Sequence, residues 1–385
     1  MYTVKTLNKI AAIGTERLDT NYFQLDDGCA DPDAIIVRSA DMSGFEPGAN
    51  LACVARAGAG YNNIPVERLA TKGIVAFNTP GANANAVKEM TICALLLASR
   101  NIIGSVQWLA TIAGQAAMMP PFSNKDEYVS NAVEGGKSTF KGPELYGKTL
   151  GLLGLGHVGA KVAKAAHDLG MTVVGYDPFV SEETIAELKG ICEIVDSSDE
   201  LYPRADYISL HLPYNNDTRH TIRKDTILKM KRGKVRIINI ARGELVNDED
   251  MEYALAMGYV ARYVTDFPNG KTIAMEGAVA LPHLGASTPE SEDNCAIMAA
   301  DQISEYMLRG NIINSVNLPN IKMDRSGKYR AVVIARDSAD ISIKGKAYAE
   351  KINFGYKVAL IDFDDAPDEA ALKAIPGVIR VRVVS

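Results

Sequence analysis

Short runs of consecutive apolar residues alternate along the chain with segments that repeat apolar residues at helical spacing. In the first hundred residues the runs expected to be strands are 34–38, 53–56 and 74–77. In a second region they are 149–153, 172–176, 207–210, 235–240 and 263–265. Buried parallel strands have continuous apolar runs and need helical crossovers between them. The pattern therefore predicts an α/β protein with two doubly wound parallel sheets of Rossmann-like type.

Longer helical patterns and one irregular stretch complete this part of the chain. A helical pattern runs from Ala84 to about Gln107, another from Ala160 to Leu169, and a third from about Ser291 to Arg309. The stretch from about Ala113 to Pro143 is rich in Gly, Pro and Ser. We interpret that stretch as an ordered excursion or a lid rather than as part of a core.

The segment after Pro319 repeats strand and helix patterns on a smaller scale. Strands are expected at 329–335, 357–363 and 378–384, and helices at 339–351 and 368–374. This order predicts a small open α+β sheet of ferredoxin-like type. A central hairpin in such a sheet would have to turn at Asn353–Gly355.

Composition and charge narrow the class of protein. The chain has 385 residues, 47% of them hydrophobic and 23% charged, as in a globular protein of two or three domains. Its net charge of −6 is the wrong sign for a nucleic-acid or anionic-membrane partner. The five cysteines include no CxxC pair, no metal site is indicated, and the N-terminus lacks a signal-peptide pattern, so we expect a cytoplasmic protein.

A glycine-rich segment at 151–159, GLLGLGHVG, follows one expected strand and opens a helix. Within it Gly154, Gly156 and Gly159 fit the GxGxxG pattern, in which glycines allow a tight turn, close approach of the pyrophosphate and helix packing. The next expected strand ends at Asp177, 18 residues after Gly159, where a carboxylate can accept from ribose hydroxyls. A carboxylate there repels a 2′-phosphate, so the segment predicts binding of NAD rather than NADP.

Two further segments carry candidate chemistry. One is INIARGELV at 238–246, at the end of an expected strand, and the other is LPHLGAST at 281–288, which precedes a helical pattern. By themselves, Arg242 could be a surface ion-pair partner and His283 a loop histidine bonded to backbone.

Together with the glycine-rich loop, these segments resemble the D-isomer-specific 2-hydroxyacid dehydrogenase family, and within it the short D-3-phosphoglycerate dehydrogenases. The resemblance also rests on 37–39, 56–63, 78–83 and 141–145. It implies a substrate-binding domain of residues 1–95 and 284–318, an inserted NAD-binding domain of residues 96–283, and an ACT-like regulatory domain of residues 319–385. The resemblance also implies an active site in the cleft between the first two domains.

The resemblance implies roles for particular residues. Arg242 would bind the substrate carboxylate, His283 would exchange the proton of the C2 hydroxyl, and Asp266 would accept from the nicotinamide carboxamide. The remaining expected cofactor contacts are Gly154, Leu155, Gly156, His157, Val158, Gly159, Asp177, Pro178, His211, Leu212, Pro213, Thr218, Asn239, Ala241 and Gly285. The expected substrate contacts besides Arg242 are Arg38, Ser39, Arg56, Gly58, Ala59, Gly60 and Asn83, with Arg38 and Arg56 as phosphate ligands.

One departure from the family pattern concerns the catalytic histidine. The family usually places a Glu beside it, in the loop after the Asp266 position. Counted without gaps, that position falls at 269–271, where no residue is acidic. Either Glu276 reaches His283 through a rearranged loop, or His283 works without its carboxylate.

The expected activity is NAD-dependent oxidation of D-3-phosphoglycerate to 3-phosphohydroxypyruvate, the first step of serine synthesis, by a homodimer or homotetramer. The alternatives are a glyoxylate/hydroxypyruvate reductase, another D-2-hydroxyacid dehydrogenase, or an NAD-sensing module of corepressor type. The phosphate ligands Arg38 and Arg56 distinguish a phosphoglycerate dehydrogenase from enzymes of unphosphorylated acids. The C-terminal domain argues against the corepressor-type module.

Overall fold

The computed structural model describes residues 1–343 and 345–385, which divide into two compact units. Unit 1 comprises Met1–Asn83 and Thr288–Ser385, and unit 2 comprises Ala84–Ser287. One unit is therefore inserted into the other. The boundary falls before helix α3 (Ala84–Ser99), not at 95/96, because the apolar face of α3 is part of a hydrophobic cluster of unit 2.

Unit 2 is built on a seven-stranded parallel sheet in the order β12-β11-β10-β9-β6-β7-β8. Starting from β6, the chain builds outward in one direction and then in the other, which is the doubly wound arrangement. The strands are β6 (Thr149–Leu153), β7 (Thr172–Tyr176), β8 (Cys192–Ile194), β9 (Tyr207–Leu210), β10 (Arg236–Asn239), β11 (Arg262–Thr265) and β12 (Ala278–Ala280). The helices beside the sheet, besides α3, are α6 (His157–Asp168), α7 (Glu182–Glu187), α8 (Ser198–Leu201), α9 (Lys224–Ile227), the 3-10 turn η2 (Gly243–Leu245) and α10 (Asp248–Ala256).

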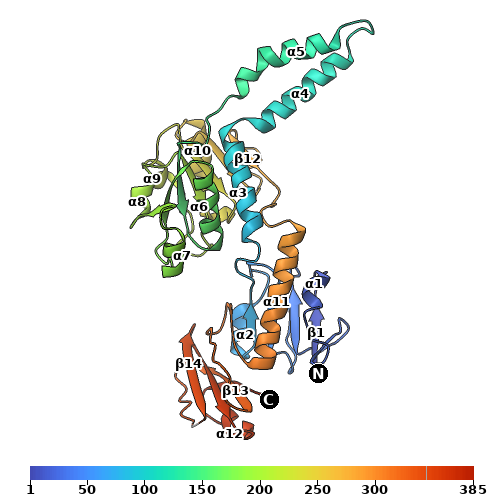
Figure 1. The fold of residues 1–385 in the computed structure, drawn as a ribbon, viewed down its shortest axis with the longest axis vertical. Coiled ribbons are helices and arrows are strands. Elements are labelled where there is room, and N and C mark those ends of the chain that lie inside the picture. The colour runs from blue at the N-terminus through green and yellow to red at the C-terminus, as the bar shows by residue number, and fades with distance from the viewer. Residues whose placement is uncertain (344) are drawn as a thin grey trace. The chain divides into compact units, whose positions relative to one another are not determined.

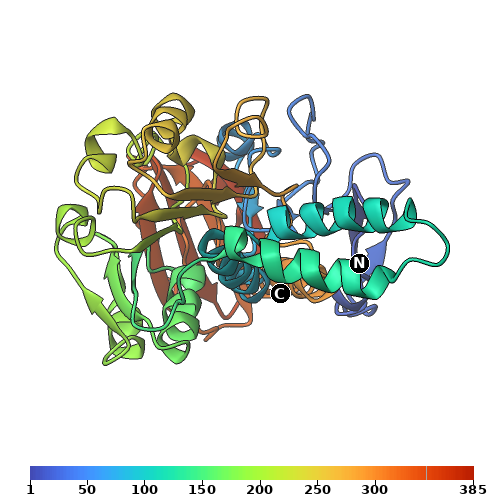
Figure 2. The same ribbon diagram turned by 90° about the horizontal axis from the view of Figure 1, so that it is seen from above.

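A helical hairpin of α4 (Ile102–Ala117) and α5 (Lys125–Gly136), followed by the 3-10 turn η1 (Lys137–Phe140), projects from unit 2 (Figures 1 and 2). The prediction of one helix from 84 to about 107 was wrong, because Asn101 interrupts it and caps α4 by accepting from Gly104 N. The lid expected at 113–143 is also mostly helical, since Asn124 caps α5 in the same way. Within the described ranges no single helix is both long and apolar enough to cross a bilayer, and only α3 and α4 together, across their 65° bend, pass the same test.

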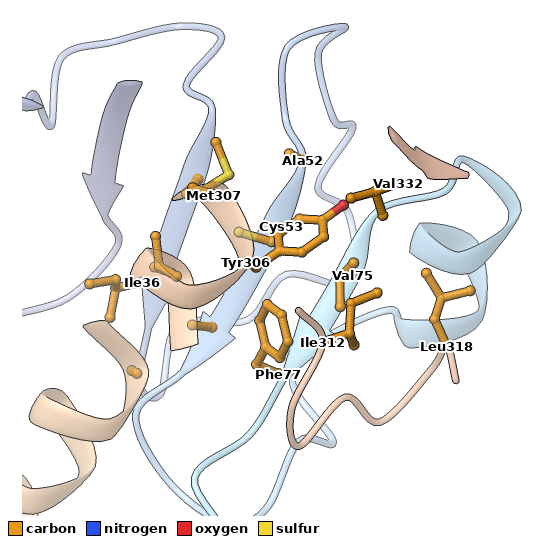
Figure 3. Close-up of a cluster of buried hydrophobic side chains, with 14 of the residues drawn as sticks. Ile36, Ala52, Cys53, Val75, Phe77, Tyr306, Met307, Ile312, Leu318 and Val332 are labelled. Atoms are coloured by element: carbon orange, nitrogen blue, oxygen red, sulfur yellow. The ribbon is translucent and has the colours of Figure 1, made fainter. Parts of the chain in front are cut away.

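Unit 1 contains a five-stranded parallel sheet in the order β2-β1-β3-β4-β5. Its elements are β1 (Tyr2–Thr6), α1 (Ala12–Thr15), β2 (Phe23–Leu25), β3 (Ala34–Val37), β4 (Cys53–Arg56), α2 (Val66–Thr71), β5 (Val75–Phe77) and α11 (Pro289–Arg309). Figure 3 shows the cluster in which α11 packs on this sheet, where the rings of Phe77 and Tyr306 lie 5.9 Å apart edge to face. Helix α11, in the part of the chain that returns to unit 1, thus completes the hydrophobic core on one face of this sheet.

The C-terminal segment forms an antiparallel sheet in the order β14-β15-β13-β16. Its elements are β13 (Tyr329–Arg336), β14 (Ala347–Asn353), β15 (Tyr356–Phe363), α12 (Glu369–Lys373) and β16 (Val378–Val384). This strand order is that of a ferredoxin-like sheet, with a hairpin at Phe354 and Gly355, whose φ angles are positive. The helix predicted at 339–351 was wrong, because its last five residues, 347–351, belong to β14, the edge strand of the sheet, and residues 339–343 and 345–346 form no helix; residue 344 lies outside the described residues.

A buried ion pair fastens this sheet to the end of α11. Arg330 and Asp362 are both fully buried, and two guanidinium nitrogens of Arg330 donate to the two carboxylate oxygens of Asp362 at 2.6 and 2.9 Å. Arg330 also donates to the carbonyl oxygens of Arg309, at 3.0 Å, and Met323, at 2.8 Å. Asp362 in turn accepts from Ser326 N at 2.7 Å. The pair therefore links the antiparallel sheet to the end of α11 and to the segment that connects α11 with β13.

Candidate active site

The glycine-rich loop lies between β6 and the start of α6, as predicted. A side chain on Gly159 would place its Cβ 2.1 Å from the carbonyl oxygen of Gly154, and one on Gly154 would lie 2.6 Å from the carbonyl oxygen of His211. The side of Gly156 where a Cβ would stand is open, and no side chain caps α6. The first N–H groups of α6 are thus available to an anion, which fits a pyrophosphate.

Asp177 stands at the end of β7, beside this loop. Its Oδ2 accepts from Leu155 N at 2.8 Å, and its Oδ1 accepts from Phe179 N at 2.9 Å. These bonds fix the carboxylate against the loop and leave further lone pairs for ribose hydroxyls. Pro178 continues the same turn, while His157 and Val158 begin α6.

The chain after β9 forms another part of the same sheet edge. Burial lowers the pKa of His211 to about 4, so that its ring is neutral near neutral pH, and its Nε2 pairs with Ser209 Oγ at 3.0 Å. Leu212 and Pro213 follow, and Thr218 Oγ1 donates to the carbonyl oxygen of Pro213 at 2.7 Å. The hydroxyl of Thr218 therefore holds the loop in shape.

Asn239, at the end of β10, shapes the loop that carries Arg242. Its side chain is fully buried, and its Oδ1 accepts from Ala241 N at 3.2 Å and Arg242 N at 3.3 Å. Its Nδ2 donates to the carbonyl oxygen of Arg242 at 2.8 Å. These bonds occupy the amide, so Asn239 positions Arg242 by fixing its backbone.

Arg242 and His283 are brought together across one aromatic ring. The ring centre of Phe267 lies 4.6 Å from that of His283 and 5.9 Å from the guanidinium carbon of Arg242. His283 is exposed and has a φ of +50°, and it lines a hollow of about 1010 Å³ together with Asp266 and Phe267. A cation and an imidazole, 41 residues apart in the chain, therefore both contact Phe267, and the imidazole lines a cavity of unit 2.

Asp266 is the buried carboxylate of this site, at 1% exposure. Its Oδ2 accepts from Gly285 N at 2.8 Å, whereas its buried Oδ1 has no hydrogen-bond partner in the part of the chain that the structure describes. Burial raises the pKa of Asp266, although the Gly285 N–H and the neighbouring His283 and Arg242 act against it. A buried acceptor without a donor is costly, and the carboxamide N–H of a nicotinamide would satisfy it. The residues present therefore fit the cofactor.

At 269–271, where the family usually has its Glu, the side chains of Asn269 and Lys271 interact with other residues. Asn269 donates to Asp248 at 2.7 Å, and Lys271 Nζ lies 3.3 Å from Glu252 and 3.9 Å from Glu249. Over residues 1–343 and 345–385, no carboxylate oxygen lies within ion-pair distance of the His283 ring nitrogens, and Glu276 makes no hydrogen bond to it. Of the two alternatives, the structure has His283 without its carboxylate.

Unit 1 supplies the loop of residues 58–60, which is expected to contact the substrate. Arg56, at the end of β4, donates from Nε to the carbonyl oxygen of Arg38 at 3.1 Å, and a side chain on Gly58 would collide with the Arg56 guanidinium. Ala59 accepts from Asn78 Nδ2 at 2.6 Å, next to Gly60. Glycine at 58 thus lets the loop lie against Arg56.

Arg38 is engaged by a residue that the sequence analysis missed. Its Nη2 lies 2.7 Å from Glu292, near the start of α11, and both side chains are partly exposed. Asn8 was missed as well: its Oδ1 accepts from the backbone N–H groups of Arg38, Ser39 and Ala40 at 2.8–3.2 Å. Asn8 and Glu292 stand alone in the sequence, outside any motif that could have indicated them. Asn83 is the last residue of unit 1, directly before α3.

The match to known proteins agrees with this geometry. Residues 116–285 match the family described as D-isomer specific 2-hydroxyacid dehydrogenase, NAD binding domain. The chain is 35% identical over 283 residues to the hydroxypyruvate reductase of Thermotoga maritima, an alignment of 70% of this chain and 83% of that protein. The chain therefore belongs to the D-isomer-specific 2-hydroxyacid dehydrogenase family, and NAD is the cofactor of its nucleotide-binding domain.

Two of the similar proteins are named as phosphoglycerate dehydrogenases. The chain is 35% identical over 314 residues to the D-3-phosphoglycerate dehydrogenase of Methanocaldococcus jannaschii, which is 79% of this chain and 55% of that protein. The NAD+-bound 3-phosphoglycerate dehydrogenase of Entamoeba histolytica matches with a TM-score of 0.62 and 26% identity, over 82% of this chain and 98% of that one. The chain spans about half the length of the curated D-3-phosphoglycerate dehydrogenases that it matches. The predicted fold class and the NAD cofactor are confirmed.

We expect Gly159→Ala to weaken NAD binding about tenfold or more, because its Cβ would displace the backbone of Gly154 and with it the pyrophosphate loop. Quenching or transfer of NADH fluorescence on titration measures this. Gly114→Ala is the matched control, since the space around Gly114 in α4 is open and its φ is ordinary. Equal NADH affinity in the Gly159 variant and the control would contradict the assignment of this loop.

Proposed function

We propose that the protein is an NAD-dependent dehydrogenase of D-2-hydroxyacids that oxidises D-3-phosphoglycerate to 3-phosphohydroxypyruvate. The observation that carries the proposal is the grouping of Arg242, Phe267 and His283 beside the unsatisfied carboxylate oxygen of Asp266. The relatives named D-3-phosphoglycerate dehydrogenase support the choice of substrate. The product is the keto acid that transamination converts toward serine, so we place the reaction at the start of serine synthesis.

The proposed reaction uses the side chains as follows. His283 takes the proton of the C2 hydroxyl while hydride leaves C2, so that the alcohol becomes a ketone and one proton is released. Arg242 is always charged and can form bidentate hydrogen bonds, and it holds the carboxylate and the C2 oxygen. When bound, NAD would supply the hydride acceptor, and Asp266 would hold its carboxamide. In the reverse direction His283 returns the proton.

The phosphate of the substrate is assigned to Arg38 and Arg56, on neighbouring strands of unit 1. The Arg38–Glu292 pair is partly exposed, and such pairs contribute little to stability, so a phosphate dianion can replace Glu292 as the partner of Arg38. The same pair favours a second candidate function: Glu292 repels a phosphate, as suits a reductase of unphosphorylated hydroxypyruvate. The Thermotoga maritima relative bears that name.

The deciding experiment follows NADH formation from 3-phosphoglycerate and NAD at alkaline pH with a product trap, beside D-glycerate. We expect turnover of the phosphorylated acid alone. Arg56→Gln should raise the KM for 3-phosphoglycerate, and the matched Arg68→Gln, on α2, should leave it unchanged. Turnover of glycerate would identify a general 2-hydroxyacid enzyme, and turnover of neither acid would favour the NAD-sensing module.

We further propose that the α4–α5 hairpin forms the homodimer contact and that the C-terminal sheet is an ACT-like regulatory domain. The hairpin exposes an apolar stripe at helical spacing on α4, formed by Ile102, Val106 and Leu109. Val106→Asp combined with Leu109→Asp should convert the dimer to a monomer, because a charge cannot be buried unpaired in such a contact. Light scattering after gel filtration measures the mass, with Ile185→Asp on α7 as the control. A dimer that survives the double substitution would refute this contact.

A further inference from the structure

A second hollow, of about 700 Å³, lies inside unit 1 at the junction of its two sheets. It is bounded by β16 and α12 on one side, and by the chain before β4 and β5 on the other. Its charged lining side chains are Lys72, Glu369, Lys373, Arg380 and Arg382.

This hollow is separate from the loop assigned to the substrate. Ala49 and Asn50, which line it, precede β4, whereas the Gly58–Gly60 loop follows β4. In a parallel sheet these are opposite edges, and a four-residue strand alone separates them by roughly 13 Å. A ligand in the hollow would therefore bind away from the substrate loop of unit 1.

The positive charges of the lining exceed the negative ones. Lys373 is paired with Glu369 at 2.7 Å, and Lys72 is paired with Glu46 at 3.3 Å. In the ranges that the structure describes, neither Arg380 nor Arg382 has a carboxylate within ion-pair distance. Two guanidinium groups thus lie at one wall of the hollow without a carboxylate in direct contact, although Asp31 is near enough to favour the charged form of Arg380.

Both arginines are held by the protein itself rather than extended into solvent. Arg380 donates to the carbonyl oxygens of Ala49 and Asn50, each at 3.2 Å, and of Leu51. Arg382 lies over the ring of Tyr306, with its guanidinium carbon 4.7 Å from the ring centre. Because side chains alternate along a strand, the two arginines project from the same face of β16.

A partly buried cation without an anion is unfavourable, and two adjacent ones are more so. Burial, together with the charge of Arg382, lowers the pKa of Arg380. An anion bound between Arg380 and Arg382 would offset both the cost of burying these cations and the repulsion between them. We propose that this hollow binds a small polyanion, a phosphorylated or multiply carboxylated metabolite.

The lining also limits the kind of ligand. It contains no aromatic side chain among the described residues, so no aromatic ring is available there to stack on a nucleotide base. Guanidinium groups form bidentate hydrogen bonds with phosphate and with carboxylate groups alike. The hollow has room for more than one such group, which favours a compact ligand with two or three anionic groups.

The test is calorimetric titration of the full chain with pyrophosphate and, separately, with citrate at constant ionic strength. We expect at least one of them to bind with one-to-one stoichiometry and to raise the Tm. Arg380→Gln should weaken that binding about tenfold or more, and the exposed Lys373→Gln should weaken it several-fold. Binding of pyrophosphate alone would identify a phosphorylated ligand, and binding of citrate alone a carboxylated one.

Two control variants make the result specific to this hollow. Lys346→Gln removes an exposed, ion-paired lysine from the C-terminal segment outside the hollow, and it should leave the affinity unchanged. Arg242→Gln changes the proposed catalytic site and should also leave it unchanged. Loss of binding in the Arg242 variant, equal affinity in Lys373→Gln and wild type, or no binding of either probe would each overturn the proposal.

Discussion

Replacement of His283 by Asn is expected to lower kcat for 3-phosphoglycerate oxidation by about 10²–10⁴-fold, because the C2 hydroxyl then loses the group that takes its proton. Asn is chosen because it tolerates the left-handed backbone that His283 adopts, with φ at +50°. Steady-state kinetics beside NADH binding separate the two roles, since the variant should bind the cofactor as well as wild type does.

His220→Asn is the matched control for this substitution. His220 lines the same hollow and has a φ of +51°, so the exchange makes the same chemical and backbone change at a histidine without a proposed proton transfer. Equal loss of kcat in both variants would assign the effect to the shape of the hollow. An unchanged kcat in His283→Asn would remove the proposed acid–base role.

Arg330→Met is expected to lower the free energy of unfolding by about 3–5 kcal/mol, because it leaves Asp362 buried without its cation. Urea denaturation followed by far-ultraviolet circular dichroism measures the loss. The double variant Arg330→Met with Asp362→Leu should recover most of it, since no isolated charge then remains. A double variant no more stable than Arg330→Met would show that the remaining hydrogen bonds, rather than the charge pair, dominate.

The same pair predicts how stability depends on pH. Burial raises the pKa of Asp362, but the bonds from Arg330 and Ser326 outweigh it, so that the pKa in the folded chain is lowered. The stabilisation is therefore fully present above the unfolded pKa of about 4, and it is lost as the pH falls through the lower folded value. Wild type should lose stability on acidification in this range more steeply than the double variant does.

The parts of the fold that were predicted correctly depend on local patterns. The apolar runs that became β3, β4, β6, β7 and β9 are buried on both faces, so their composition alone distinguishes them. The edge strand β14 has mostly exposed residues, and only its partner β15 makes it a strand. Sequence reasoning therefore predicted a helix in its place.

By itself, the sequence determined the family, the position of the glycine-rich loop with Asp177, and Arg242 and His283 as the candidate catalytic residues, because each lies in a short motif. The tertiary structure decided the partners of these groups. Glu292 reaches Arg38 across 254 positions, and Arg380 reaches the chain before β4 across more than 300. Such contacts depend on how helices and sheets pack, and a single sequence carries no local signal for them.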